Sequence, residues 1–448
     1  MKNNDLTEGN ILSSLIKFAL PVLLALFLQA LYGGIDLLIV GRFGETADVS
    51  GVSTGSMVMQ MMTTVITGLT IGITILVGQS IGEKNPEKAG KGIGSGIFLF
   101  LIIALILSVA AGMFSNQLSL MMHAPEDAFA QTGQYIRICG FGFLFVVAYN
   151  VLGGIFRGLG DSQTPLITVA MACVVNIFGD LILVKGFCLG AAGAALATIF
   201  AQAISVAVSL LMIRKKNLPF IFSIKDIRFD REIIDKELRL GTPIALQELL
   251  VGLSFLVIQI IVNSMGMIAS AGVGIAEKIC VFIMLVPSAY MQSMSAFVAQ
   301  NMGAGRADRS KKALLYGIIS SLLAGSVMAY ITVFHGNVLA SLFSGEQKVI
   351  GAAYDYLKAY GIDCLLVSIL FCFIGYYNGC GNTMFVMLQG LMGAFCVRIP
   401  FVYLMSGREG VTLFHIGLGT PAASTVQITL CLVMYFVVRR RTKQFRKE

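Results

Sequence analysis

Long apolar runs dictate what this chain can become. Twelve stretches reach about 20 residues, the length that carries an α-helix across the hydrocarbon of a bilayer. A transmembrane barrel would instead show alternating segments of about ten residues. The sequence therefore predicts an all-α integral membrane protein with twelve transmembrane helices. The expected helices are 13–41, 53–79, 93–115, 134–156, 165–185, 191–213, 241–265, 272–300, 313–335, 354–378, 385–406 and 417–438.

Composition excludes the soluble classes. Hydrophobic residues make up 56% of the chain and charged residues 12%, against about 25% charged residues in an ordinary globular protein. Disorder would need low hydrophobicity and high charge. The opening Met1–Asn10 is polar, and Lys17 precedes an apolar run that contains Pro21. This pattern predicts a first spanning helix, since no small-residue cleavage site of a signal peptide follows it.

The two halves of the chain resemble each other at an almost constant offset. Six helices per half is an even number, so both halves keep one orientation and should be related by a pseudo-two-fold axis along the membrane normal. We expect an N-lobe at 1–213, a cytoplasmic linker at 214–240 with a short amphipathic helix near Arg231–Leu238, and a C-lobe at 241–448. The matching segments are Leu20–Gly44 with Thr242–Gly266, Gln79–Gly82 with Gln300–Gly303, and Arg157–Asp161 with Asn378–Asn382.

The distribution of Lys and Arg predicts the orientation. If both termini are cytoplasmic, 24 of the 32 basic residues lie on the cytoplasmic side, which satisfies the positive-inside rule. The same bias accounts for the net charge of +8, so no nucleic-acid partner is implied. The remaining basic residues are Arg42, Arg137, Lys185, Lys348, Lys358 and Arg408 on the outer side, and Lys278 and Arg398 within spans.

No residue pattern indicates an enzyme or a bound cofactor. The nine cysteines have no paired or metal-ligand spacing, and the three histidines (His123, His335, His415) lie singly, so we expect no metal site of this kind. The chain has no Gly-Lys-Ser/Thr loop that could cradle phosphates, and so it should not hydrolyse ATP. We find no nucleophile–base constellation.

Buried acids in the N-terminal half are the main functional signal. A charge within hydrocarbon costs several kcal/mol, so each needs a reason. Asp36 and Asp180 should reach similar depth, with Asn176 one turn from Asp180 and Asn150 on the preceding helix. Paired carboxylates suit a proton site, and oxygen ligands suit a hard cation such as Na⁺. The alternative is that these side chains only hold neighbouring helices together.

The C-terminal half does not duplicate this group, because Ile258 matches Asp36 and Val397 matches Asn176. Polar residues occur elsewhere in this half and form a possible second coupling site. Adjacent Glu277 and Lys278 should point to different faces, so Lys278 more plausibly meets Asp363 or Glu248. A structural ion pair is an equal alternative. The possible site comprises Glu248, Glu277, Lys278 and Asp363, with Arg398 as a further candidate for bonding helices.

A polar face with flexible neighbours is a candidate substrate surface. Gln60, Thr64 and Thr67 follow helical spacing beside four methionines, and Gln29 precedes Asp36 by two turns. Thioethers adapt to many shapes, which would suit a promiscuous pocket. Methionines that merely fill gaps between helices are the alternative. We take Gln29, Asp36, Gln60 and Thr64 as candidate substrate contacts.

These motifs together resemble the multidrug and toxic compound extrusion (MATE) family over nearly the whole chain. The resemblance rests on the first-helix pattern, on a Gly-Gln motif after the second helix, and above all on the loop after the fourth. The motifs are Leu20-Pro21 through Gln29, Asp36 and Val40-Gly41-Arg42; Val77-Gly78-Gln79 with Gly82; Phe156-Arg157-Gly158-Leu159-Gly160-Asp161-Ser162-Gln163-Thr164-Pro165; Asn176 through Asp180; and Arg398-Ile399-Pro400.

The resemblance implies two six-helix lobes around a cavity in a bacterial plasma (inner) membrane, acting as a monomer. It implies export of amphipathic, often cationic compounds against inward proton or sodium flow, with no other cofactor. The family's N-lobe cation site maps onto Asp36, Asn150, Asn176 and Asp180, and Pro21 becomes a hinge. One branch couples through C-lobe acids, for which Glu248 and Asp363 are candidates, so the coupling lobe stays open.

The alternative function is a flippase for a lipid-linked precursor, from the same broader superfamily. A cavity for a pyrophosphate headgroup should carry several cationic residues. Only Lys278 and Arg398 qualify here.

Overall fold

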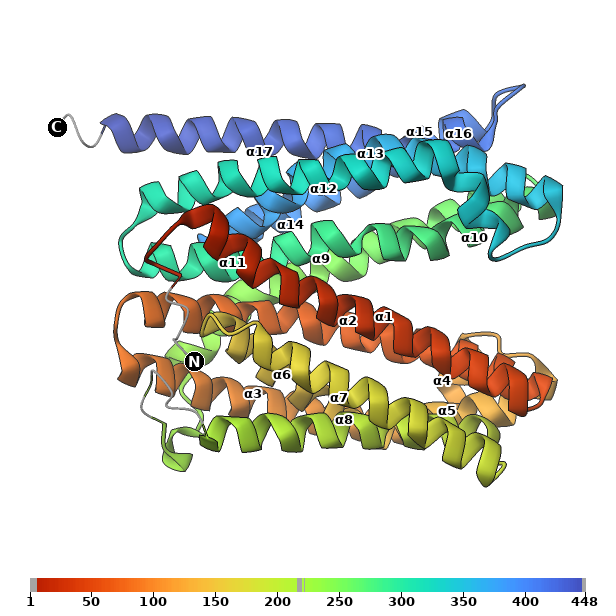
Figure 1. Cartoon of the computed structure of the whole chain (residues 1–448), viewed down its shortest axis with the longest axis horizontal. Coiled ribbons are helices and arrows are strands. Elements are labelled where there is room, and N and C mark those ends of the chain that lie inside the picture. The colour runs from red at the N-terminus through yellow and green to blue at the C-terminus, as the bar shows by residue number, and fades with distance from the viewer. Residues whose placement is uncertain (1–5, 216–219, 221, 445–448) are drawn as a thin grey trace. The chain divides into compact units, whose positions relative to one another are not determined.

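The structure, a computed structural model, describes residues 6–215, 220 and 222–444 (Figure 1). Helices account for all of the regular structure in these ranges. Ten helices are long and apolar enough to cross a membrane, and two bent pairs raise the number of spans to as many as twelve. The predicted all-α membrane fold is therefore confirmed.

The chain divides into two compact units. Unit 1 comprises Met1–Ala245 with Ala299–Ala307, and unit 2 comprises Leu246–Val298 with Asp308–Glu448. Two helices are divided between the units, namely α9 (Arg231–Asn263) and α11 (Leu285–Gly303), and a third, α12, has only its first residue, Ala307, in unit 1.

The remaining elements belong to one unit each. Unit 1 contains α1 (Ile11–Phe43), α2 (Thr46–Gly82), α3 (Pro86–Met113), α4 (Ser115–Met121), η1 (Glu126–Ala128), α5 (Phe129–Phe141), α6 (Phe143–Gly158), α7 (Gln163–Asp180), η2 (Leu181–Gly186), α8 (Gly190–Lys215) and η3 (Ile224–Asp226). Unit 2 contains α10 (Met267–Ile283), α12 (Ala307–Ser341, from Asp308), α13 (Gln347–Gly379), α14 (Thr383–Leu391), η4 (Met392–Arg398), α15 (Ile399–Ser406), α16 (Leu413–Gly417) and α17 (Gly419–Gln444).

The observed spans differ from the predicted ones mainly in their bends. The fourth span is the pair α5 and α6, bent by 51°, and the eighth is the pair α10 and α11, bent by 40°. The helix expected to start at 241 begins instead at Arg231. The amphipathic stretch before 241 continues it, and an Asp235–Arg239 ion pair at i,i+4 supports that first part. Residues 216–219 and 221 of the expected linker lie outside the described residues.

Local sequence signals set the helix ends. The Asn10 side chain accepts from the backbone N–H of Ser13 and caps α1. Asp161 accepts from the N–H groups of Gln163 and Thr164 at the start of α7. The preceding Gly160 has φ +82°, and its repeat counterpart Gly381 has φ +80°. Glycine is needed at both places because other residues rarely adopt positive φ, so the two halves share this turn.

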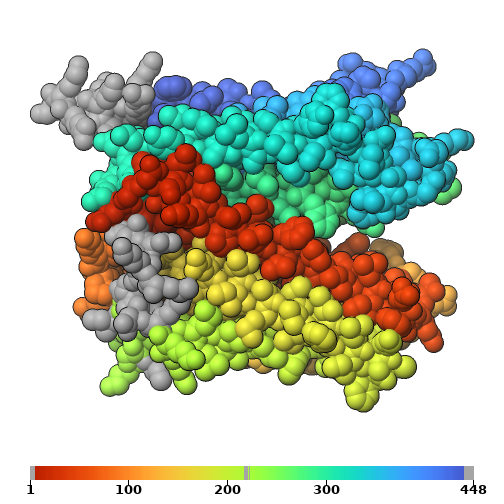
Figure 2. All heavy atoms as spheres, viewed as in Figure 1, coloured from red at the N-terminus to blue at the C-terminus, as the bar shows by residue number. Residues whose placement is uncertain are grey.

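Small residues let α7 and α8 pack closely in unit 1. A Cβ on Gly179 would lie 3.0 Å from the Ala197 side chain, and Gly190 to Ala195 are all buried. α7 also packs against α1. Figure 2 shows the red atoms of α1 running along the yellow atoms of α7. These contacts bring polar side chains of three helices to one place.

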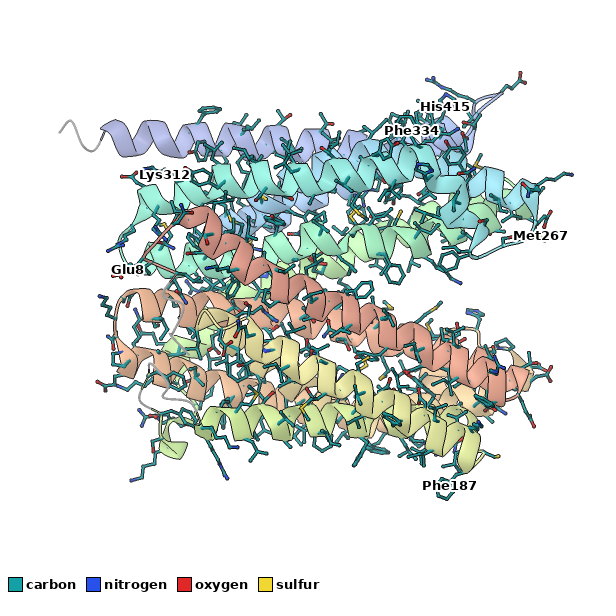
Figure 3. The ribbon with its side chains drawn as sticks, viewed as in Figure 1. Glu8, Phe187, Met267, Lys312, Phe334 and His415 are labelled. Atoms are coloured by element: carbon teal, nitrogen blue, oxygen red, sulfur yellow. The ribbon has the colours of Figure 1, made fainter. Side chains whose placement is uncertain are left out.

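Each unit contains a π-helical turn beside one of its buried charges. η2 begins directly after Asp180, and η4 ends at Arg398. π-turns are rare, and they occur frequently at functional sites. Figure 3 shows Glu8 and Phe187 near opposite ends of unit 1, and Lys312 and Met267 near opposite ends of unit 2.

Candidate functional site

The acids predicted in the N-terminal half meet inside unit 1. Asp36 of α1 and Asp180 at the end of α7 lie close enough for their carboxyl groups to influence each other electrostatically. Asp36 is 6% exposed, Asp180 is 0% exposed and Asn176 is 1% exposed. The sequence prediction of a common depth therefore agrees with their positions.

Thr198 of α8 completes this group. Its hydroxyl donates to Asp36 Oδ2 at 3.2 Å and lies 3.5 Å from Asn176 Nδ2, which can donate to it. The sequence reading missed Thr198. It lies on the predicted sixth helix. A single hydroxyl after a run of alanines and glycines could have indicated a polar side chain at a close helix contact.

Several oxygens of this group have no hydrogen-bond partner although they are buried. They are Asp36 Oδ1, Asn176 Oδ1 and both carboxylate oxygens of Asp180. Lone pairs of this kind are costly to bury unless a partner satisfies them. Hard cations prefer such carboxylate, amide and hydroxyl oxygens. The group therefore has the chemistry of a proton or Na⁺ site.

Asn150, the fourth predicted member, has other partners. Its Nδ2 donates to the carbonyl of Val146, and its Oδ1 accepts from Thr67 at 3.2 Å. No described contact joins it to Asp36. Asn150 directly follows Tyr149 on α6, and the Tyr149 hydroxyl accepts a hydrogen bond from Gln29.

A second polar layer lies on the same helices as the acids. Tyr32 is one turn from Asp36, and Gln202 is one turn from Thr198; Gln202 Nε2 donates to the Tyr32 hydroxyl at 3.2 Å. One further turn along α1, Gln29 Nε2 donates to the Tyr149 hydroxyl at 2.8 Å. The sequence analysis found Gln29 but missed both tyrosines. The signal for Tyr32 was its position three residues after Gln29 and four before Asp36, whereas Tyr149 lies on α6 and had no such signal.

The candidate substrate residues of α2 differ in exposure. Gln60 is exposed, and the Thr64 hydroxyl donates to the carbonyl of Gln60. Met57 and Met61 are exposed, at 57% and 42%, while Met59 and Met62 pack against the apolar core. Two of the four methionines thus lie on an open surface, and the other two fill gaps in the apolar core.

Unit 2 contains a buried acid and a buried guanidinium that influence each other electrostatically without forming an ion pair. Asp363 of α13 is 0% exposed and lies within electrostatic range of Arg398, which is 6% exposed. Arg398 Nη1 donates to the Ser254 hydroxyl at 3.2 Å, and the guanidinium lies 4.3 Å from the Phe255 ring centroid. The expectation that Lys278 meets Asp363 or Glu248 is wrong, because Lys278 forms no ion pair with a described residue and Arg398 is the nearby cation.

Glu277 and Lys278 point to different faces of α10, as predicted. Glu277 is part-buried, with its Oε1 enclosed and unpartnered, whereas Lys278 is exposed. Glu277 lies near Tyr356, and both Glu277 and Asp363 lie near Cys280. Glu248 is part-buried on α9 and has no hydrogen bond or ion pair to these acids among the described residues. The four predicted residues therefore do not form one site.

The fold and the site define a polytopic, all-helical membrane transporter with a buried acid pair. The MatE family model matches residues 21–182 and again 243–404. The second match is displaced by 222 residues from the first, which confirms the internal repeat. The chain belongs to the MATE family. Members of this family are transporters, so the chain is a transporter and not an enzyme.

Individual relatives match almost end to end. The chain is 28% identical to the probable multidrug resistance protein YpnP of Bacillus subtilis over 94% of both chains. It is 23% identical to the multidrug export protein MepA of Staphylococcus saprophyticus over 97% of this chain and 95% of that one. A crystal structure of a MATE protein in a straight conformation superposes with a TM-score of 0.91 at 19% identity, covering 100% of both chains.

Proposed function

We propose that the protein exports amphipathic, often cationic drugs and toxic compounds in exchange for protons or Na⁺, by alternating access. The observation that carries this proposal is the buried Asp36–Asp180 pair, whose free oxygens face Asn176 and Thr198 without any cationic side chain among their described contacts. An exchangeable cation can supply the missing partner. The names of the relatives YpnP and MepA support drug export as the cargo.

The acid pair makes binding of cation and substrate mutually exclusive. A proton or Na⁺ enters the group from outside and neutralises Asp36. The helix α1 then bends at Pro21, because proline lacks an N–H and so removes one helical hydrogen bond. Gln29 and Asp36 share α1, so this movement changes the substrate contacts at the same time. Substrate leaves outward, and the cation leaves to the cytoplasm in the alternate state.

Charge arithmetic limits the stoichiometry. One charge moved through about 100 mV gains about 2.3 kcal/mol, which sustains roughly a 50-fold gradient. A monocationic drug exchanged for one cation moves no net charge and gains nothing from the potential. Strong export of such drugs therefore requires more than one cation, or a chemical gradient of the ion.

We place the protein in the plasma membrane as a monomer with both termini cytoplasmic. The excess of Lys and Arg in the loops assigned to that side supports this orientation. We keep the predicted lobes 1–213 and 241–448, and the connecting stretch 214–240 includes the first ten residues of α9. We assign coupling to Asp36, Asn176, Asp180 and Thr198, with Asn150 nearby, and a structural role to the Asp363–Arg398 group.

The test is transport of a fluorescent cationic dye in proteoliposomes under an imposed proton or sodium gradient, with Asp36→Asn alongside. We expect gradient-driven dye movement in the natural protein and its loss in the variant. Dye movement that survives in Asp36→Asn would move coupling to Glu248 or Asp363. No dye movement under either gradient would instead favour a lipid-precursor flippase.

A further inference from the structure

Glu237 is a buried acid that the proposed coupling site does not use. It lies in the first part of α9, which belongs to unit 1, and it is 3% exposed. Ile234, Leu240 and Ile244 of the same helix are also buried, so Glu237 lies within the apolar stripe of an amphipathic stretch. Helices of this kind normally keep their charged residues on the opposite face. A carboxyl group within the stripe therefore calls for an explanation.

The packing of unit 1 leaves space for this carboxyl group but gives it no polar partner. A Cβ on Gly96 of α3 would lie 2.9 Å from Glu237 Oε1 and 2.7 Å from the Ile73 side chain of α2. Any larger residue at position 96 would therefore collide with the carboxyl group. A Cβ on Gly72 of α2 would lie 2.8 Å from the carbonyl oxygen of Glu237, so the helices approach closely. Both carboxyl oxygens of Glu237 are buried without a hydrogen-bond partner.

No charged group within the described ranges compensates Glu237 electrostatically. The helix α2 has no charged residue between Val49 and Gly82, and α11 has none. The charged groups near this part of unit 1 pair with each other, bind a backbone N–H or are exposed. They are Lys88 with Glu83 and Lys91 with Glu87 at α3; Asp226, which accepts from the N–H of Ser223, and the exposed Lys225 in η3; and Asp235 with Arg239, and the exposed Arg231, Glu232 and Lys236, in α9.

These surroundings fit the protonated form of the acid. An ionised carboxylate is unfavourable where no polar group replaces its water. A Na⁺ ion would need several oxygen ligands, whereas the neighbours of the carboxyl group are Gly96 and the Ile73 side chain. A proton neutralises the group without any further ligand.

We propose that Glu237 is a proton-binding site separate from the Asp36–Asp180 pair, and that the bound proton holds the first part of α9 against α2 and α3. Loss of the proton creates a charge that water stabilises better than this interface does. The carboxylate then moves out to water, and the first part of α9 separates from the two helices.

The position of Glu237 within α9 gives this proton a role in the transport cycle. α9 is divided between the two units after Ala245, and Pro243 interrupts its hydrogen bonding just before that point. Release of the first part of α9 therefore loosens the connection through which the units move. This role rests on the proposed function and on the cytoplasmic position of 214–240, and it makes conformational change easier as the cytoplasm becomes more alkaline.

The test is hydrogen–deuterium exchange of residues 231–241 in the purified full chain in lipid nanodiscs, with each rate divided by the intrinsic rate at that pH. An exposed glutamate has an ordinary pKa of about 4.3, so opening of this segment should release a proton between pH 5 and 7. Corrected exchange in the natural protein should therefore rise about tenfold per pH unit. Glu237→Gln cannot release a proton, and its corrected exchange should not change with pH.

Two further variants make the result decisive. Glu237→Met places an apolar side chain of similar length in the site, so it should lack the pH response even if the amide of Glu237→Gln fits poorly. Glu232→Gln removes an exposed carboxylate of the same helix and should keep the natural response. The inference is overturned if corrected exchange of the natural protein does not rise with pH, or if it rises equally in Glu237→Gln and Glu237→Met.

Dye transport tests the role in the cycle. With the proton gradient held fixed, raising the pH on both sides together should speed turnover of the natural protein more than that of Glu237→Met, and an equal response would overturn this role. The exchange measurement needs no dye. Absence of dye transport by the natural protein would therefore overturn the proposed function and leave the result on the proton site standing.

Discussion

The first helices of the two halves share an internal proline but differ at the position of the buried acid. α1 and α9 both contain an internal proline, Pro21 in one and Pro243 in the other, at the repeat offset. Asp36 of α1 corresponds to Ile258 of α9, which is 1% exposed and packs in an apolar cluster with Val262 and Tyr356. The repeat thus conserved the bend-prone helix, whereas only the first copy carries the acid.

The two units also treat their buried acids differently. Unit 1 surrounds Asp36 and Asp180 with neutral groups and leaves four oxygens without partners. Unit 2 also leaves both Asp363 oxygens without a hydrogen-bond partner, but it places the Arg398 guanidinium, a permanent cation, within electrostatic range of them. The difference teaches that a buried acid is available for ion exchange only where the protein does not supply its own permanent cation.

The largest contrast should come from removing the acids of unit 1. Asp36→Asn and Asp180→Asn each take away a carboxylate that the coupling cation needs, and we expect gradient-driven transport to fall about 100-fold, or about 2.7 kcal/mol. Glu248→Gln and Glu277→Gln should lower it less than threefold. Initial rates in proteoliposomes measure this, and equal losses in both pairs would erase the distinction between the units.

Removing Asp363 should instead damage the fold. Asp363→Asn leaves the Arg398 guanidinium buried without its neighbouring charge, which costs about 3 kcal/mol. Thermal unfolding in detergent should show a lower Tm for Asp363→Asn. The double variant Asp363→Asn with Arg398→Met should recover most of the loss. Asp36→Asn should leave Tm almost unchanged, and a large drop there would assign a structural role to the acid pair.

The two prolines should also differ in effect. Pro21→Ala restores an N–H to α1 and stiffens the helix that carries Asp36, so we expect turnover to fall about tenfold, equivalent to about 1.4 kcal/mol. Pro243→Ala alters the matching helix, which has Ile258 in place of the acid, and should change turnover less than twofold. A comparable loss in both variants would show that bending matters without the acid.

The smallest effect should identify the ion. Thr198→Val keeps the shape but removes the hydroxyl, worth about 1 kcal/mol or about fivefold in affinity. The apparent affinity falls if the ion is Na⁺, because an oxygen ligand is lost. It rises if the ion is a proton, because the ionised carboxylate loses a donor. Cation titration of transport measures the change, with Thr429→Val, whose hydroxyl donates to Thr425, as the matched control. No change at all would exclude Thr198 from the site.

Run lengths and apolar composition were enough to predict an all-helical membrane protein with up to twelve spans. Bilayer thickness sets the length of a spanning helix, and the hydrocarbon requires its side chains to be apolar. The offset between the halves was visible in turn motifs such as that of Gly160 and Gly381, since positive φ requires glycine there. The acid pair could be found because charge in hydrocarbon is costly. The start of α9 was misplaced because polar residues before 241 read as a linker.

Other features depend on packing between helices and could not be predicted from the sequence alone. The π-turns after Asp180 and before Ile399 have no local sequence signature. The proximity of Asp363 to Arg398 joins two helical segments, α13 and η4, and helix periodicity gives no relation between side chains on different helices. The position of Thr198 under Asp36 follows from the close approach of α7 and α8 at Gly179.

The most direct test of the asymmetry between the units is cation binding by purified protein. Proton release and ²²Na⁺ binding would be measured on addition of a transported dye to the natural protein, Asp36→Asn and Asp363→Asn. We predict that dye displaces the cation from the natural protein and from folded Asp363→Asn, and that Asp36→Asn neither binds nor releases it. Displacement that persists in Asp36→Asn but disappears in folded Asp363→Asn would contradict coupling through unit 1.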